Sequence, residues 1–267
     1  MKYIAEIGWN FMGDLDLAKS MIKDAKESGA TIAKFQYWNP DKLKSGPWDV
    51  DGRRAIYEKS YLNEQKIDAL KTACESANIE FLVSAFNEGD AKFIKDLGVT
   101  SIKIPSHSSH DEKLHQYAAS NFESIFVSLG ACSGKEFNNA VEIYKAERGG
   151  DWIPMHCVSA YPCPAENANL PRLKYFTGLS NEFGYSDHTQ DIITPAVAVA
   201  LGARVVEKHF TSDKTLPGRD NQFALVKDEF EKMIQNCELA LSSTIDHGIE
   251  SLEIEKDTIN TYRGRWG

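Results

Sequence analysis

Charged side chains occur inside segments of the sequence that otherwise have the pattern of buried strands. Four of them lie among β-branched and other apolar neighbours: Glu6, Lys34, Lys103 and Glu207. A buried charge is costly unless it is paired or binds a ligand, so each of the four needs a partner. Any one of them alone is explained by a structural ion pair. Together with hydroxyl residues near the ends of the same segments, they favour a site for an anionic substrate.

Two histidines stand at the ends of consecutive strand-like segments. His188 closes the segment 182–188, and His209 lies near the end of the segment 204–210. If these strands are neighbours in a sheet, the two imidazoles can hold a divalent metal, with carboxylate and water completing its shell. A separation of 21 residues is not a metal signature by itself, so two structural histidines are the alternative.

Strand-like and helix-like segments alternate along the chain. The β-branched runs predict strands at 3–8, 31–36, 80–86, 101–106, 124–130, 152–159, 182–188 and 204–210. The amphipathic stretches predict helices at 14–28, 63–77, 89–97, 111–120, 135–147, 169–178, 192–201 and 227–243, with the weakest pattern at 169–178. Such alternation is typical of a parallel sheet.

The number of strand–helix units indicates the fold class. Eight units in 267 residues predict an α/β protein with a single-domain (β/α)8 TIM barrel over 1–243, and an open doubly wound sheet is the alternative. The tail 244–267 is expected to pack on the barrel or extend from it. The long connections 37–62 and 211–226 both follow strands, on the face where barrel enzymes carry their active sites.

Composition limits the function classes. The chain is 42% hydrophobic and 26% charged, which is ordinary for a globular protein. Its formal net charge of −9 argues against a nucleic-acid partner. We expect no membrane partner, because no apolar run reaches the length of a span, and no signal peptide, because the N-terminus lacks an apolar core. Five cysteines without a CxxC pair fit reduced thiols, so we expect a cytoplasmic protein.

A series of motifs follows the strand ends in a fixed order. The series is Ala5-Glu6-Ile7-Gly8, Ala33-Lys34-Phe35-Gln36, Lys103-Ile104 with Ser106, Val127-Ser128, His156 to Pro162, Gly184 to Thr189, Glu207 to Thr211, and Gly218-Arg219-Asp220. It resembles the barrel domain of the N-acetylneuraminate (sialic acid) synthase family, which includes legionaminate and pseudaminate synthases. The resemblance spans nearly the whole chain, and the GYSDHT and EKHFT segments are highly specific in combination.

The resemblance implies a reaction and a site. The reaction is the condensation of phosphoenolpyruvate with an N-acylhexosamine-like sugar aldehyde by C–O cleavage, giving a nonulosonic or related 2-keto-3-deoxy sugar acid plus phosphate. Phosphoenolpyruvate is placed on Lys34, Lys103, Ser106, Ser128, Ser159, Tyr161 and Ser186. A divalent metal, first Mn²⁺ with Mg²⁺ or Co²⁺ as alternatives, is placed on His188 and His209. Glu6 and Asp220 are the implied catalytic residues, and the implied sugar-side residues are Asn10, Phe11 and Gln36.

The sequence departs from the family pattern in segments assigned to the sugar. Phe11 stands where the family has histidine, Asn221 also replaces a histidine, and His107-Ser108 replaces a glycine and an acidic residue. Past the barrel, the 267 residues do not show the pattern of the family's C-terminal antifreeze-like domain, so we expect a barrel domain without it. Because the metal and phosphoenolpyruvate positions are retained, we expect the same chemistry with an altered acceptor, in a homodimer or with a separate capping subunit.

Two other functions are open at this point. A pyruvate-using barrel aldolase or lyase would need Lys34 or Lys103 as a Schiff base, which borohydride would trap. A catalytically inactive binding or scaffold subunit would bind phosphoenolpyruvate and metal but release no phosphate.

Overall fold

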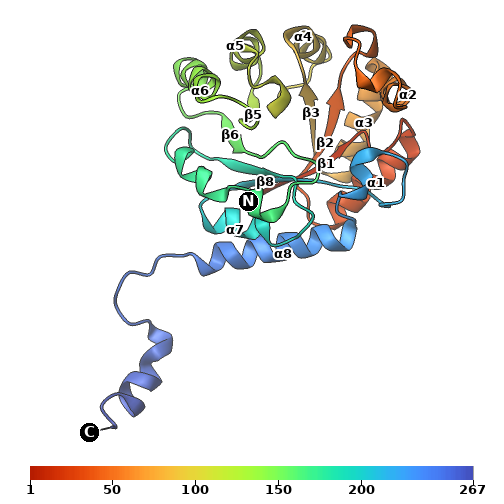
Figure 1. Ribbon diagram of the computed structural model, residues 1–267. Helices are drawn as coiled ribbons and strands as arrows, with labels where there is room; N and C mark the ends of the chain where they lie inside the picture. Colours follow the sequence, from red (N-terminus) through yellow and green to blue (C-terminus); the bar gives the residue numbers. More distant parts are fainter. Residues whose placement is uncertain (267) are drawn as a thin grey trace.

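Eight parallel strands close into a barrel with helices around it in the computed structural model, which describes residues 1–266 (Figure 1). The strands are β1 (Lys2–Gly8), β2 (Ile32–Tyr37), β3 (Glu80–Ala85), β4 (Ser101–Ile104), β5 (Ser124–Ser128), β6 (Ile153–His156), β7 (Gly184–Asp187) and β8 (Val205–His209). The α-helices are α1 (Leu15–Glu27), α2 (Arg53–Ser60), α3 (Glu64–Ala77), α4 (Glu88–Asp96), α5 (Glu112–Asn121), α6 (Gly134–Arg148), α7 (Thr194–Ala200) and α8 (Lys227–Ser243). Each strand pairs with the next, and β1 pairs with β8, which confirms the predicted barrel.

Short polar side chains fix where several helices begin. A side-chain oxygen accepts a hydrogen bond from a backbone N–H of the first turn at Asp14, Asn63, Asn87, Asp111 and Ser133. These caps satisfy donors that have no partner within the helix. The sequence therefore determines where the chain leaves the loops above the barrel and enters α1, α3, α4, α5 and α6.

The barrel interior changes from apolar to polar along its axis. One end is filled by a buried cluster of Ile4, Ile32, Leu82, Phe126, Ile153, Met155 and Val205. Side chains alternate along a strand, so Glu6 points inward like Ile4, and it is in register with Lys34 of β2. Further round the barrel, Ser186 of β7 is in register with Glu207 of β8. The charged residues thus lie above an apolar base, at the carboxyl ends of the strands.

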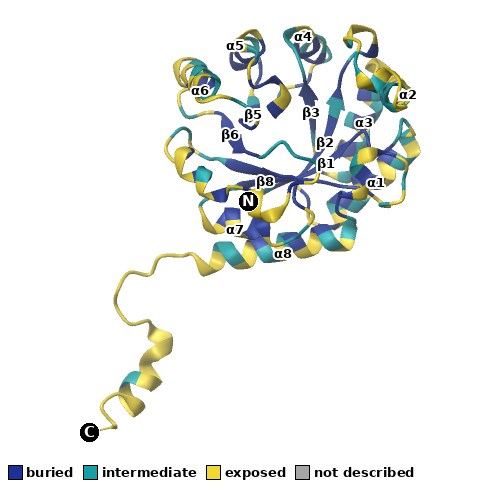
Figure 2. Ribbon diagram, viewed as in Figure 1, coloured by how far each residue is buried: buried dark blue, intermediate teal, exposed yellow. Residues whose placement is uncertain are grey.

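The main apolar layer lies between the strands and the helices. Figure 2 shows the strands buried and most helices buried only on the side facing them. Residues that alternate with the inward-facing charges belong to this layer, such as Ala5 and Ile7 beside Glu6, and Phe35 beside Lys34. One side of each strand therefore holds the fold together while the other carries the site.

Two expectations about secondary structure were wrong. The segment 169–178, predicted as an α-helix, contains a 3-10 helix at Leu170–Tyr175, and this segment had the weakest helical pattern in the sequence. The long connection 37–62, in which no helix was predicted, contains α2 and two 3-10 turns, Pro40–Lys42 and Pro47–Asp49. The connection after β2 is thus an ordered wall above the barrel.

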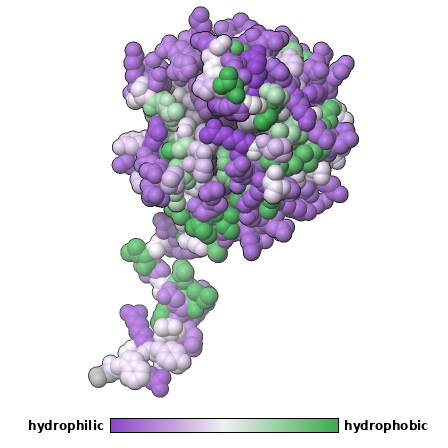
Figure 3. Space-filling view, turned by 45° about the vertical axis from the view of Figure 1, so that its right-hand side comes forward, coloured by the Kyte–Doolittle hydropathy of each residue, from purple (hydrophilic) through white to green (hydrophobic). Residues whose placement is uncertain are grey.

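The C-terminal segment extends away from the barrel after α8 (Figures 1 and 2). Residues 244–266 are exposed, apart from a half-buried Ile259. Exposed apolar side chains such as Ile249, Ile254 and Trp266 are spread along it, and Figure 3 shows hydrophobic and hydrophilic residues interleaved there. None of the helices within residues 1–266 combines the length and apolarity that a membrane span requires.

Candidate active site

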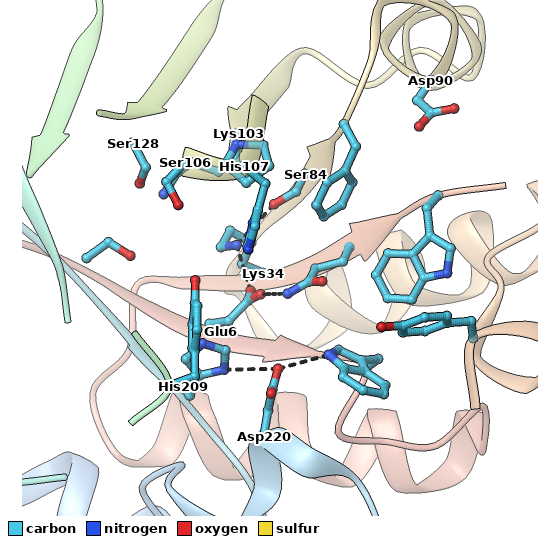
Figure 4. Close-up of a pocket in the computed structure, with 18 of the residues that line it drawn as sticks. Glu6, Lys34, Ser84, Asp90, Lys103, Ser106, His107, Ser128, His209 and Asp220 are labelled. Carbon is cyan, nitrogen blue, oxygen red and sulfur yellow. Dashed lines mark hydrogen bonds and ion pairs between the residues drawn. The ribbon is translucent and has the colours of Figure 1, made fainter. Parts of the chain in front are cut away.

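A cavity of about 500 Å³ opens at the carboxyl ends of the strands (Figure 4). Its walls come from the strand ends, the connection after β2 and the loop after β8. Most residues singled out in the sequence line it: Glu6, Lys34, Gln36, Lys103, Ser106, Ser128, Tyr161, Ser186, His188, His209 and Asp220. This is the face on which (β/α)8 barrels carry their active sites.

Two lysines and two glutamates form an ion-pair network at the floor of the cavity. Lys103 Nζ lies 2.7 Å from Glu207 Oε2, and Lys34 Nζ lies 2.8 Å from Glu6 Oε2. Lys34 Nζ is also 3.6 Å from Glu207 Oε1, which accepts a hydrogen bond from Ser186 Oγ at 2.9 Å. All four charged side chains are buried. The network brings two ammonium groups to the cavity floor, where each is paired with a glutamate carboxylate.

The two glutamates of the floor differ in their affinity for protons. Burial raises the pKa of Glu6, and the Lys34 ammonium offsets this only in part. Burial also acts on Glu207, but the charges of Lys103 and Lys34 outweigh it and lower the pKa of Glu207 to about 2. Neighbouring carboxyl groups with separated pKa values commonly divide the acid role from the charge-stabilising role. Glu6 therefore binds a proton more readily than Glu207, which stays negatively charged.

The two lysines also differ. Burial disfavours the charge on Lys34, but Glu207 and Glu6 outweigh it and raise the pKa of this lysine. Burial dominates at Lys103 and lowers its pKa, even though Glu207 opposes the effect. Lys34 is thus the more firmly charged member of the pair.

Serine hydroxyl groups border the lysines. Ser106 and Ser128 line the cavity, and Ser106 Oγ lies 2.7 Å from Ser159 Oγ, which stands behind it. Gly130 makes this packing possible, because a Cβ there would lie 2.3 Å from Cys157 Sγ and 3.1 Å from Ser159 Oγ. Ser159 does not line the cavity itself, but it holds the hydroxyl group of Ser106 in place there.

His188 and His209 lie side by side at one wall, with ring centroids 5.8 Å apart. His188 Nδ1 is 2.6 Å from the carbonyl oxygen of Val158, which leaves its Nε2 free for a ligand. His209 Nδ1 is buried without a hydrogen-bond partner among the described residues. Burial lowers the pKa of each histidine to about 4, so both are neutral at pH 7, as metal binding requires.

These features fit two positions of a metal shell. A ligating histidine commonly gives its second ring N–H to a carbonyl or carboxylate oxygen, as His188 can give its Nδ1–H to Val158. Asp220 Oδ2, at 3.9 Å from His209 Nδ1, brings a carboxylate to the same wall. Residues 1–266 contain no group of three or more His, Cys, Asp and Glu side chains arranged to hold a metal. Water or substrate oxygen atoms would complete the shell.

An aromatic collar surrounds the cavity above the floor. We use this name for the rings of Tyr161, His107, Phe86, Trp38, Trp9 and His209. From Tyr161 round to Trp9, successive ring centroids are 6.1, 6.4, 5.8 and 6.2 Å apart. The His209 ring centroid lies 6.0 Å from that of Tyr161. Asp220 lies between Trp9 and His209, since its Oδ2 accepts a hydrogen bond from Trp9 Nε1 at 2.9 Å and is 3.9 Å from His209 Nδ1. The aromatic collar and the ion-pair network thus line the same cavity.

The structure does not bring Asn10 and Phe11 to the cavity, which corrects their expected place on the sugar side. Asn10 Nδ2 donates a hydrogen bond to the carbonyl oxygen of Phe210 at 2.8 Å, which ties the loop after β1 to the end of β8. Phe11 is fully buried in the layer between strands and helices, 5.9 Å from the ring of Phe35. Its ring therefore cannot contact an acceptor. Gln36 does line the cavity and donates a hydrogen bond to Glu6.

Several residues of the site were missing from the sequence assignment. Glu207 appeared there only as a buried charge, although its alternation with His209 along β8 places both on the inner face. Trp38, Tyr57, Phe86 and His107 were not assigned at all. Their signal was weak, because aromatic residues in or beside loops more often pack against the protein than line a site.

The fold and the cavity together define a class, a (β/α)8 barrel with a cavity at the carboxyl ends of its strands that is lined by buried lysines and glutamates. The family model described as "NeuB family" matches residues 21–247. The chain belongs to the NeuB family, the phosphoenolpyruvate-dependent sialic and nonulosonic acid synthases. The family expected from the motifs is confirmed.

Named relatives and a solved structure agree with this assignment. The chain is 34% identical over 252 residues to N,N'-diacetyllegionaminic acid synthase of Legionella pneumophila, covering 87% of this chain and 70% of the relative. It is 33% identical over 255 residues to pseudaminic acid synthase of Campylobacter jejuni, covering 91% and 74%. The crystal structure of N-acetylneuraminic acid synthetase from Leptospira borgpetersenii, in complex with citrate, superimposes with a TM-score of 0.86 at 30% identity, covering 98% and 92%.

Proposed function

We propose that the chain condenses phosphoenolpyruvate with an N-acylhexosamine-like aldehyde, giving a nonulosonic acid and phosphate. The observation that carries this proposal is the buried pair Lys34 and Lys103, bordered by serine hydroxyl groups on the cavity floor of a NeuB-family barrel. The carboxylate and phosphate of phosphoenolpyruvate match two ammonium groups and several hydroxyl donors.

The floor binds phosphoenolpyruvate and orients it. Lys34 and Lys103 contact its two anionic groups, and the hydroxyl groups of Ser106 and Ser128 donate hydrogen bonds to its oxygen atoms. Ser186, whose hydroxyl donates to Glu207 Oε1, lies beside them on the floor. Ser159 supports Ser106 from behind, and the Tyr161 ring covers the bound molecule from the collar side. Orienting two reactants in this way supplies about 7–11 kcal/mol toward a bimolecular step.

Proton transfer accompanies the carbon–carbon bond. C3 of phosphoenolpyruvate attacks the aldehyde carbon, water adds to C2, and phosphate leaves with its bridging oxygen as the C2–O bond breaks. The former aldehyde oxygen takes up one proton. The attacking water gives up one proton as it adds to C2 and its second as the C2 keto group forms, and the departing phosphate takes up that second proton. Glu6, whose raised pKa lets it hold a proton on the cavity floor, supplies the proton for the aldehyde oxygen. Asp220, held by Trp9 at the collar, accepts a hydrogen bond from the acceptor sugar and positions it.

His188 and His209 would hold a divalent metal, with Mn²⁺ the first choice and Mg²⁺ or Co²⁺ as alternatives. Bound there, the metal supplies charge stabilisation for the developing alkoxide or lowers the pKa of the water that adds to C2. The Val158 carbonyl fixes the ring of His188, and the Asp220 carboxylate balances charge beside His209. A homodimer partner or a separate capping subunit would close the cavity from above.

Phosphate release tests the proposal. The protein is mixed with phosphoenolpyruvate, Mn²⁺ and, in turn, hexosamine, diacetamido-sugar and simple aldose acceptors. We expect chelator-sensitive release with an N-acyl acceptor, and ¹⁸O from the bridging position should appear in the phosphate. His209→Ala should abolish release, and His110→Ala, an exposed change outside the cavity, should not. Release that persists in chelator, or label retained in the sugar acid, contradicts the proposal.

A further inference from the structure

A histidine ring extends into the cavity from the turn directly after β4. His107 belongs to the 3-10 turn Ser106–Ser108, and its side chain is exposed and lines the cavity. Figure 4 shows the ring pointing into the cavity. The hydroxyl group of Ser108 donates instead to the carbonyl oxygen of Phe86, at 2.7 Å. His107 is therefore the titratable side chain that this turn brings to the cavity, at a position where the family pattern has glycine.

The neighbours of His107 place it on the side of the cavity that the proposed function gives to phosphoenolpyruvate. The preceding residue, Ser106, also lines the cavity. The Tyr161 ring is nearly parallel to the His107 ring, at 12°, with the two centroids 6.1 Å apart. The Phe86 ring centroid is 6.4 Å away. Because Ser106 and Tyr161 are both proposed contacts of phosphoenolpyruvate, we expect the imidazole to lie beside that ligand.

The His107 ring is neutral at pH 7. Desolvation lowers the pKa of His107 below its usual value, and no hydrogen bond or charge within residues 1–266 opposes this effect. The ionisable groups that line the cavity from the neighbouring elements are Lys103 of β4, Lys34 of β2, Lys42 and Arg53 of the connection after β2, Asp90 of α4, and Tyr161 after β6. A neutral imidazole has one unprotonated nitrogen, which can accept a proton.

The other groups on this side are poor proton acceptors. Lys34 and Lys103 are held in ion pairs with glutamates. Glu207 has a pKa of about 2, so it has little affinity for a proton at neutral pH. Burial raises the pKa of the Tyr161 hydroxyl group, which therefore keeps its proton. In the proposed function, Glu6 gives a proton to the aldehyde oxygen, and the water that adds to C2 needs a different group to take one up.

We propose that His107 is the base that takes up the first proton of the water adding to C2. As the water oxygen bonds to C2, this proton passes to the unprotonated imidazole nitrogen. The second proton of the water goes to phosphate when the C2–O bond breaks. After turnover His107 holds one extra proton and Glu6 lacks one, and transfer through solvent restores both groups. The role as a base rests on the proposed function, whereas the place of the ring rests on the turn after β4 and on Tyr161.

The place of the ring can be tested without turnover. Nitrogen NMR of the full chain with labelled histidine gives the pKa of each imidazole, and the variant His107→Asn identifies the signal of His107. Phosphoenolpyruvate brings a phosphate dianion, which favours the charged form of a nearby imidazole. Saturating phosphoenolpyruvate should therefore raise the pKa of His107 by at least about one pH unit. His110, exposed and outside the cavity, is the control. No response of His107, or an equal response of His110, overturns the inference.

Kinetics separate a base from a residue that only binds phosphoenolpyruvate. Phosphate release is measured in the parent, His107→Asn and His110→Asn. The loss of a general base should reduce kcat at least about a hundredfold, with a change in the KM for phosphoenolpyruvate below about threefold. In the parent, kcat should decrease as the pH is lowered through the pKa of His107, because the protonated ring cannot accept a proton. His107→Asn should lose this dependence, and added imidazole should restore part of the rate of His107→Ala.

The outcomes distinguish the base from the reaction itself. An unchanged kcat or an unchanged pH profile in His107→Asn overturns the inference and leaves the proposed function standing, as does an equal loss of kcat in His110→Asn. A large rise in KM with kcat preserved also overturns it, because His107 would then bind phosphoenolpyruvate without acting as a base. A parent that binds phosphoenolpyruvate but releases no phosphate with any acceptor contradicts the proposed function and the base with it.

Discussion

Replacing Glu207 by glutamine tests whether the floor is an ion-pair network. Glutamine keeps the volume and one acceptor oxygen but removes the charge that Lys103 contacts at 2.7 Å and Lys34 at 3.6 Å. Glu6 would then be the remaining carboxylate beside two buried ammonium groups. Breaking a buried pair by removing one partner costs roughly 3–5 kcal/mol. A change of 1 kcal/mol shifts Tm by about 2–4 °C in a protein of this size, so Glu207→Gln should lower Tm by about 6–20 °C.

The control is an ion pair of similar length on the surface. Lys2 Nζ lies 2.7 Å from Glu182 Oε2, and both side chains are 43% exposed. Exposed pairs contribute about 0–1 kcal/mol, so Glu182→Gln should leave Tm nearly unchanged. Both variants are compared with the parent by calorimetry and urea unfolding at pH 7. Equal, small shifts for the two variants would refute the description of the floor as a buried network of charges.

Three further predictions follow from the site and its surroundings. Lys103→Ala should raise the KM for phosphoenolpyruvate at least about tenfold by removing a buried anion-binding group, and an unchanged KM would remove Lys103 from the site. The pKa of His209 is about 4 in the folded protein and near 6.5 in the unfolded chain, so the unfolded chain takes up a proton first as the pH is lowered. The free energy of unfolding should therefore decrease as the pH is lowered from about 6.5 to about 4, and urea titrations should show a smaller decrease for His209→Gln. Lys208 donates hydrogen bonds to Asp187 and Thr189 outside the cavity, so Lys208→Met should lower the free energy of unfolding by about 3–5 kcal/mol without changing phosphoenolpyruvate binding, and altered binding would show that this pair reaches the site.

The sequence predicted the barrel because its strands and helices have distinct periods and follow each other regularly. Alternation along β1 and β2 was enough to place Glu6 and Lys34 on one face, since register within a barrel leaves little freedom. Because consecutive strands are neighbours in a barrel, the histidines that close β7 and β8 were expected side by side, and the structure has their rings 5.8 Å apart.

The conformation of the loops was harder to predict from the sequence. Phe11 lies three residues beyond the end of β1, in a turn where side chains no longer alternate between the two faces of a strand. The sequence therefore could not show whether its ring points toward the cavity or toward the helices. The collar draws its rings from the ends of several strands, and their closeness follows from side-chain packing that no spacing encodes. The sequence indicated that Glu207 is a buried charge, but only the structure shows that it pairs with both Lys34 and Lys103.

The five tryptophans give the protein a built-in optical reporter. Trp9, Trp38 and Trp48 line the cavity, whereas Trp152 is 3% exposed and Trp266 is 83% exposed on the C-terminal segment. A water-soluble quencher will extinguish Trp266 first, and Trp266→Phe removes its contribution altogether. The remaining fluorescence comes largely from the walls of the cavity, so titration of phosphoenolpyruvate, metal or sugar can be followed by emission from the unlabelled chain.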